Sequence, residues 1–308
     1  MYNIDKLFES VKERGAVCVG LDTGAHSVPP AEVRKADSAP AAVLAFNKAL
    51  IEATCDIAAC YKVQIAFYEE MGLEGFKVYA ETLQYIRKKG LLAIADIKRG
   101  DIADTAARYA KAHFDGELEA DFVTLSPYMG MDTLDPWLAW AKSKGKGAFI
   151  LMRTSNAGMR DFQYLEVAGG GGRLYNAVGD KLSLLAKDVP GKYGYGAFGA
   201  VIGCTEKDEV AEIRKNYANL FFLVPGYGAQ GGGAQDAALF LHNGNGAVVN
   251  ASRSIIEAWR GELKAAGTLD ETSIGNDFAA GAARKAAAAM QAALQDAARV
   301  AARVAAKN

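Results

Sequence analysis

Residues 91–110, LLAIADIKRGDIADTAARYA, contain the structural unit that decides the fold. Residues 91–97 form a nearly continuous apolar run, which is typical of a strand covered on both faces. A short charged segment follows, and residues 104–114 then have helical character. A buried strand that leads directly into a helix is the repeating unit of parallel α/β proteins.

The same unit recurs along the whole chain. Seven further apolar runs are expected to be strands: 16–22, 60–65, 122–126, 148–153, 199–203, 221–225 and 247–250. Helical stretches lie between them, at 41–58, 71–89, 134–144, 174–188 and 207–217. Eight strands that alternate with helices predict an α/β fold, the (β/α)8 or TIM barrel. A doubly wound sheet is the alternative, but VGLDTGAHS after the first run lacks the GxGxxG turn that usually marks it.

We expect a single domain over residues 1–308, with a barrel core at about 10–262. Residues 1–15 read as a first helix, and residues 26–39 as a loop. The AGGGG segment at 168–172 reads as a flexible turn. Residues 278–307 are rich in alanine, the strongest helix former, so they predict an additional C-terminal helix that serves packing rather than catalysis.

Composition excludes several classes of function. The net charge is −1, with acidic and basic residues interspersed, which gives no support for nucleic-acid binding. The four cysteines lack CxxC spacing and the three histidines lack metal-ligand spacing, so we expect no metal site. The N-terminus lacks the features of a signal peptide, and no apolar run approaches the ~18 residues that span a membrane. A cytoplasmic enzyme without membrane contact fits best.

The strongest chemical signal lies at the end of the third predicted strand. Side chains two apart on a strand face the same side, so Asp96 and Lys98 are both expected to point into the barrel at its C-terminal end. A buried salt bridge would explain this pair equally well, because interior charges are unfavourable unless paired or used. Asp101, a third charge nearby, favours a catalytic role.

Two later loops predict a phosphate site. Pro225 and Gly226 end the seventh strand and open a glycine-rich loop, whose backbone N–H groups can approach an anion. Ser252 and Arg253 follow the eighth strand, where an arginine can hold a phosphate through two parallel hydrogen bonds. Loops after strands seven and eight are the usual phosphate site of such barrels.

Three other strand ends carry candidate binding residues. Asp22 ends the first strand and suits a sugar hydroxyl. Lys62 interrupts the second apolar run and is expected to pair with Asp96 or with substrate. Ser155 follows the fifth strand and could read the polar edge of a base, although its spacing alone favours a helix cap.

Four motifs in order resemble one known family. DIKRGDI, RTSNAG, VPGYGAQGG and NASR begin at residues 96, 153, 224 and 250. Together they resemble orotidine 5′-phosphate decarboxylase, in the bacterial branch with the KRGDI form of the DxKxxD motif. DxKxxD alone is shared with related sugar-phosphate decarboxylases and synthases, whereas the ordered set of four is far more specific.

The resemblance implies cofactor-independent decarboxylation of orotidine 5′-monophosphate to UMP and CO2, in de novo pyrimidine biosynthesis. It implies that Asp96 faces the reacting carboxylate and that Lys98 gives the proton to C6. It also implies a homodimer with shared active sites, in which Asp101 and Thr105 reach into the neighbouring subunit's site.

The remaining roles implied by the resemblance concern substrate binding. Asp22 and Lys62 would contact the ribose, and Ser155 the pyrimidine. Gln230 and Arg253 would hold the phosphate, together with backbone N–H groups near Gly226 and Ser252.

Three rival functions stay open from the sequence. A Mg²⁺-dependent sugar-phosphate decarboxylase or aldolase could use the same barrel. Lys98 could act as a Schiff-base nucleophile, although two flanking acids would keep it protonated. A non-catalytic nucleotide-binding barrel is the third, but an unused array of buried charges would be unfavourable.

Overall fold

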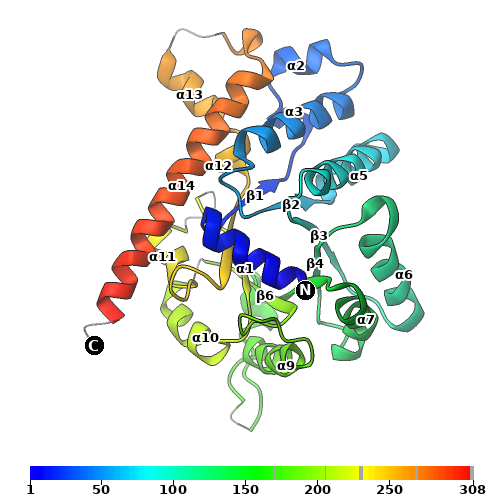
Figure 1. Ribbon diagram of the computed structural model, residues 1–308, viewed down its shortest axis with the longest axis vertical. Helices are drawn as coiled ribbons and strands as arrows, with labels where there is room; N and C mark the ends of the chain where they lie inside the picture. Colours follow the sequence, from blue (N-terminus) through cyan, green and yellow to red (C-terminus); the bar gives the residue numbers. More distant parts are fainter. Residues whose placement is uncertain (170, 205, 229–231, 268–269, 306–308) are drawn as a thin grey trace.

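Eight parallel strands close into a barrel in chain order, β1 to β8 (Figure 1). The computed structural model describes residues 1–308 except 170, 205, 229–231, 268–269 and 306–308. The strands are β1 (Val17–Leu21), β2 (Cys60–Gln64), β3 (Ala93–Arg99), β4 (Phe122–Leu125), β5 (Gly147–Arg153), β6 (Phe198–Ile202), β7 (Phe222–Val224) and β8 (Ala247–Ala251). All eight predicted strands are confirmed, and the doubly wound alternative is wrong because β8 pairs with β1.

The strands are almost wholly buried because they pack on both faces. Alternate side chains enter two separate cores. Those of Val17 and Val19 belong to the core between strands and helices. Cys18 belongs with Phe122 and Phe149 to the core inside the barrel. The centroids of these two phenylalanine rings lie 5.4 Å apart, and the rings fill the barrel near the end where its strands begin. Space for a site is therefore at the end where the strands finish.

Helices surround the barrel. They are α2 (Pro30–Lys35), α3 (Ala39–Thr54), α4 (Ala66–Glu69), α5 (Gly72–Lys88), α6 (Ala103–Phe114), α7 (Asp135–Lys144), α8 (Met159–Phe162), α9 (Leu174–Asp188), α10 (Val210–Asn216), α11 (Ala234–Ala238), α12 (Arg253–Ile256) and α13 (Ala258–Ala266). The predicted helices lie within a few residues of α3, α5, α6, α7, α9 and α10. The prediction of a loop at 26–39 was wrong in part, because Pro30 begins α2, and proline is tolerated in a first helical turn.

Helix α1 (Asn3–Arg14) closes the end of the barrel at which the strands begin. Asn3 donates to the backbone oxygen of Asp121, just before β4, and Ser10 donates to that of Ala59, just before β2. Leu7 is fully buried in the inner core. The N-terminal helix predicted from the sequence is therefore the floor of the barrel.

Helix α14 (Asn276–Ala305) is the predicted C-terminal helix. It runs beside α3, α11, α12 and α13 along one flank of the barrel (Figure 1). Its small buried side chains, among them Ala283 and Ala287, allow this close approach, and Arg284 makes a double ion pair with Asp56 after α3. Helix α14 thus packs as part of the helical layer, as the sequence predicted.

The AGGGG segment joins two extended stretches after α8. Glu166 and Arg173 form an antiparallel bridge across it, and Gly169 and Gly172 have positive φ values of 88° and 70°. Residue 170 lies outside the described residues.

Within the described part of the chain, the helices are all too short or too polar to cross a membrane.

Candidate active site

A cavity of about 530 Å³ opens at the ends of the strands, opposite α1. Each of the eight strands, or the residues directly after it, supplies part of its wall: Asp22, Lys62, Gln64, Asp96, Lys98, Thr124, Leu151, Thr154, Ser155, Val201, Leu223, Pro225, Gly226, Asn250, Ser252 and Arg253. This is the end at which barrels of this type place their active sites.

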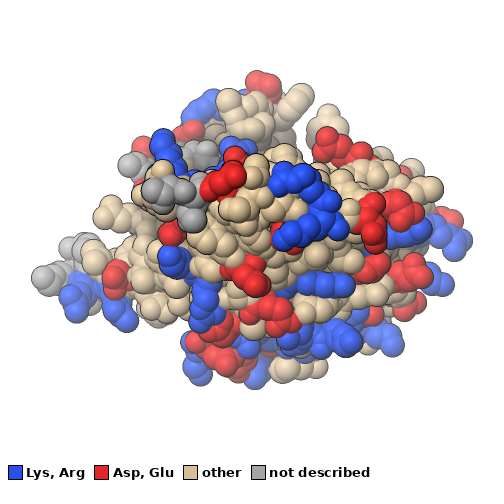
Figure 2. Space-filling view, turned by 90° about the horizontal axis from the view of Figure 1, so that it is seen from above, with Lys and Arg blue, Asp and Glu red and all other residues tan. Residues whose placement is uncertain are grey.

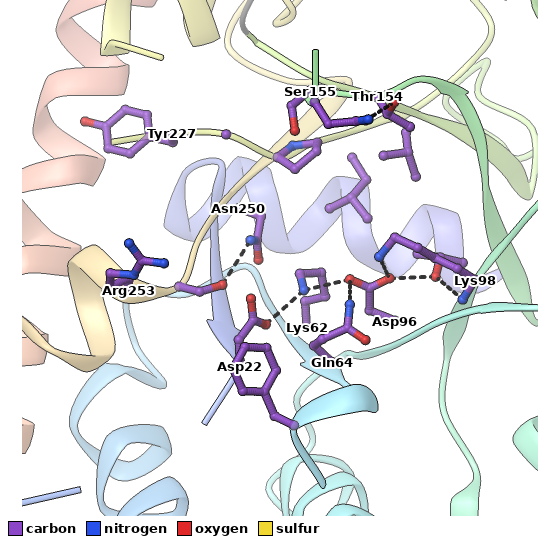
Figure 3. Close-up of a pocket in the computed structure, with 18 of the residues that line it drawn as sticks. Asp22, Lys62, Gln64, Asp96, Lys98, Thr154, Ser155, Tyr227, Asn250 and Arg253 are labelled. Carbon is purple, nitrogen blue, oxygen red and sulfur yellow. Dashed lines mark hydrogen bonds and ion pairs between the residues drawn. The ribbon is translucent and has the colours of Figure 1, made fainter. Parts of the chain in front are cut away.

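Four charged side chains of alternating sign form a row along one wall (Figure 3). Lys62 Nζ lies 3.1 Å from Asp22 Oδ1 and 2.8 Å from Asp96 Oδ2. Lys98 Nζ lies 2.6 Å from Asp96 Oδ1. The prediction that Asp96 and Lys98 face inward, and that Lys62 pairs with Asp96, is confirmed.

Asp96 lies between Lys62 and Lys98 in this row, and its carboxylate oxygens accept four hydrogen bonds. Oδ2 accepts from Lys62 and from Gln64 Nε2, at 2.8 and 2.9 Å. Oδ1 accepts from Lys98 and from Thr124 Oγ1, at 2.6 and 2.8 Å. Burial alone would raise the pKa of Asp96, but the charges of Lys62 and Lys98 hold it well below its usual range.

Lys62 is held in its charged form by the same row. Burial alone would lower the pKa of Lys62, whereas the carboxylates of Asp22 and Asp96 raise it above its usual value. Lys98 differs in access, because 47% of its side chain is exposed toward the cavity and solvent. Lys98 is therefore the more accessible of the two lysines in the row.

The opposite wall is built from the loops after β7 and β8. Figure 3 shows Arg253 across the cavity from Lys98, with Asn250 between them. Arg253 is exposed and lines the cavity. Asn250 donates to Ser252 Oγ at 3.3 Å. A β-carbon on Gly20 would lie 2.0 Å from that hydroxyl, so a glycine is needed on β1.

A buried arginine fixes the loop that carries Ser155. Arg153, fully buried at the end of β5, donates to the backbone oxygens of Gly203 and Glu206 and to Glu209. Glu209 also accepts from Arg173 at the start of α9.

Ser155 lines the cavity. The N-cap of α8 is Gly158, so the interpretation of Ser155 as a helix cap was wrong.

Two predicted residues, Asp101 and Thr105, are not gathered at this cavity. Asp101 and Thr105 lie beyond the end of β3, where Thr105 is exposed on α6 and Asp101 accepts a hydrogen bond from the backbone N–H of Ile102. Neither is among the residues that line the cavity. Gln230 lies outside the described residues.

Sequence reasoning missed several residues of the wall, above all Gln64, Thr124, Tyr227 and His26. Gln64 could have been found, because it lies two positions after Lys62 and so faces the same side of β2. Thr124 was a small polar residue within an apolar run, which by itself predicts no role. Among the described residues, no group of three or more His, Cys, Asp or Glu side chains is arranged to hold a metal ion.

Comparison with known proteins places this site in a family. Residues 16–267 match the family model described as orotidine 5′-phosphate decarboxylase / HUMPS family. The chain belongs to this family. A relative from Clostridium perfringens (strain SM101 / Type A), named orotidine 5′-phosphate decarboxylase, is 53% identical over 256 residues, which cover 83% of this chain and 89% of the relative.

Solved structures agree with this membership of the orotidine 5′-phosphate decarboxylase / HUMPS family. Leishmania donovani OMP decarboxylase matches with a TM-score of 0.68 at 31% identity, over 94% of this chain and 99% of that one. Leishmania donovani UMP synthase matches with a TM-score of 0.72 at 33% identity. The match covers 94% of this chain but only 57% of the UMP synthase chain.

Proposed function

We propose that this protein converts orotidine 5′-monophosphate to UMP and CO2, the decarboxylation step of pyrimidine biosynthesis, without a metal or cofactor. The observation that carries the proposal is the row Asp22–Lys62–Asp96–Lys98, which faces Arg253 across one cavity (Figure 3). A relative named for this activity is 53% identical to this chain over 256 residues.

The substrate spans the cavity in this proposal. Its phosphate binds Arg253, Gln230 and backbone N–H groups near Gly226 and Ser252. Its ribose contacts Asp22 and Lys62, and its pyrimidine lies beside Ser155. This order brings C6 of the base to Asp96 and Lys98.

The chemistry requires fixed charge at C6. Loss of CO2 leaves an electron pair in an sp² orbital in the ring plane, which the π system cannot delocalise. A preorganised cation in a site that excludes water stabilises such a carbanion. Lys98 supplies that charge and then transfers its proton to C6, while Asp96 keeps the ammonium group in place at 2.6 Å.

The phosphate site contributes to the reaction from a distance. Contacts to parts of the substrate that do not react can hold the reacting carboxylate against the Asp96 carboxylate, an arrangement unfavourable by itself. This explains why a decarboxylase of a pyrimidine ring carries an arginine on the far wall.

We further propose a homodimer in which Asp101 and Thr105 complete the partner's site. Both lie outside this chain's own cavity, and the nearby apolar residues Ile102, Tyr128 and Met129 are 52%, 80% and 50% exposed.

Mixing inactive Lys98→Ala and Asp101→Ala proteins tests the shared site. Exchange of subunits should restore part of the activity by forming one intact site per hybrid dimer, whereas a mixture that stays inactive contradicts the shared site.

The cytoplasm is the location we propose. Three of the four cysteines are buried with free thiols, namely Cys18, Cys60 and Cys204, which fits a reducing compartment. Figure 2 shows acidic and basic side chains interspersed on one face of the molecule, without a basic stripe typical of a nucleic-acid partner. Cell fractionation tests the location, and recovery in an exported fraction would contradict it.

The decisive experiment follows the absorbance of orotidine 5′-monophosphate after EDTA-treated protein is added. The proposal predicts loss of orotidylate and formation of UMP at an unchanged rate. Activity that EDTA abolishes and Mg²⁺ restores would favour a metal-dependent sugar-phosphate enzyme. Trapping of substrate by borohydride would favour a Schiff base on Lys98, and binding of UMP without turnover would favour a nucleotide-binding protein.

A further inference from the structure

Strand β3 contains an irregularity at the residues that form the charge row. Ala95 pairs with Val123 of β4, and Arg99 pairs with Leu125. Asp96, Ile97 and Lys98 therefore stand opposite one residue, Thr124. A bulge of this kind leaves backbone groups of the longer strand without their usual partners and redirects its side chains.

The bulge places Lys98 in an unusual backbone conformation. Its φ is +44°, in the left-handed region that L residues other than glycine rarely adopt. Such a conformation persists only when surrounding contacts impose it. The position of the Lys98 ammonium group thus depends on whatever holds this backbone.

Thr124 makes the two contacts that would do so. Its Oγ1 accepts from the backbone N–H of Lys98 at 3.0 Å. The same hydroxyl donates to Asp96 Oδ1 at 2.8 Å, the oxygen that also accepts from Lys98 Nζ. Thr124 is only 1% exposed, so water cannot easily replace it. One hydroxyl therefore connects the backbone of Lys98 to the carboxylate that binds its side chain.

We propose that Thr124 is a positioning residue for Lys98, holding both its backbone and its ion pair with Asp96. The inference rests on the proposed function, in which the placement of this ammonium group limits the reaction. Thr124 acts through Lys98 and Asp96, so its hydroxyl should affect turnover far more than substrate affinity.

Thr124→Val, which keeps the shape of the side chain and removes the hydroxyl, tests this directly. We expect kcat to fall about 100-fold, as small misplacements of a reacting group can cause, with KM and UMP affinity within roughly fivefold of wild type. Thr124→Ser keeps the hydroxyl and should retain most of kcat. Thr54→Val is the matched control, because Thr54 is a buried threonine that bonds to Leu50 and Tyr61 away from the cavity. It should leave kcat unchanged.

Crystal structures of the variants provide a readout independent of activity. In Thr124→Val, Lys98 should leave the positive-φ region or move away from Asp96 Oδ1, and in Thr124→Ser it should do neither. If Thr124→Val does not fold, Thr124→Ala serves in its place.

Three results would overturn the inference: near-wild-type kcat in Thr124→Val, an equal loss in Thr124→Ser, or an unmoved Lys98 in the Thr124→Val structure. If wild-type protein leaves orotidylate intact, the proposed function fails instead, and the structures still decide whether Thr124 positions Lys98.

Discussion

The ionisation of a single carboxylate, Asp96, organises the site at the scale of residues. Its two oxygens accept from four donors, Lys62, Gln64, Lys98 and Thr124. This environment keeps Asp96 negative although it is almost fully buried. The negative charge in turn keeps the ammonium group of Lys98 within 2.6 Å, on the side that faces the cavity.

Arg253 is expected to stabilise the transition state through its contact with the substrate phosphate. Arg253→Ala should weaken kcat/KM by about 3 kcal/mol, roughly a hundredfold, because a charge-assisted contact to the phosphate is lost. Arg299→Ala, at an exposed and ion-paired arginine on α14, is the control. Steady-state kinetics with orotidylate measures both, and an unchanged kcat/KM in Arg253→Ala would refute the phosphate role.

Simple alternation predicts part of this site from the sequence. It placed Asp96 and Lys98 on one inner surface, and the charge of Lys62 within an apolar run predicted pairing with Asp96 or with substrate. It could not reveal Thr124 as their partner, because the bulge in β3 depends on pairing with β4. Asp101 and Thr105 illustrate another limit, since both lie outside this chain's cavity and the role proposed for them in a partner's site has no signal in the strand pattern.

Strands and helices are the scale at which sequence patterns were most informative. Strands buried on both faces appear as apolar runs, so all eight could be located. The alanine-rich segment predicted helix α14, but its position beside α3 and α11 follows from long-range packing that no local pattern specifies. Helix α2 was missed because the two prolines at its start, Pro29 and Pro30, resembled a loop.

Helix α14 should tolerate charge on one face and not on the other. Ala287 is fully buried, whereas Ala288 is exposed. Ala287→Lys should reduce the free energy of unfolding by about 3 kcal/mol or more, because it buries an unpaired charge. Ala288→Lys should change it by less than about 0.5 kcal/mol. Urea unfolding compares the two variants, and equal stabilities would contradict the packing of α14 described here.

At the scale of the whole molecule, the cavity exists only because the barrel closes. Each strand contributes to it, from Asp22 after β1 to Asn250 on β8. Closure brings together residues more than 200 positions apart, such as Cys18 and Asn250. Sequence motifs can suggest such a set, but only the closed sheet brings its members to one cavity.

Stability of the whole fold should fall in mild acid, at pH values where Asp96 stays ionised. Burial, and then the nearby Arg99, lower the pKa of His113 from 6.5 to about 4. The unfolded chain therefore binds a proton that the folded chain does not between pH 6.5 and 4, so unfolding becomes easier as the pH falls through that window. The loss should total about 3 kcal/mol at pH 4.

His113→Gln isolates this effect because glutamine does not titrate. Chemical denaturation at several pH values should show a smaller loss of stability between pH 6.5 and 4 than in wild type. His242→Gln, at an exposed histidine, should keep the wild-type pH dependence. Identical pH dependence in wild type and His113→Gln would rule out His113 as the cause.

In the proposed reaction, the Lys98 ammonium group, held by Asp96, protonates the carbon that loses CO2. Single-turnover conversion of orotidylate by Lys98→Ala protein tests it most directly, with UMP binding and the unfolding transition measured to show that the site and fold persist. If Lys98 is the proton donor, the variant should fold and bind nucleotide but form almost no UMP. Conversion at a rate close to wild type would contradict it.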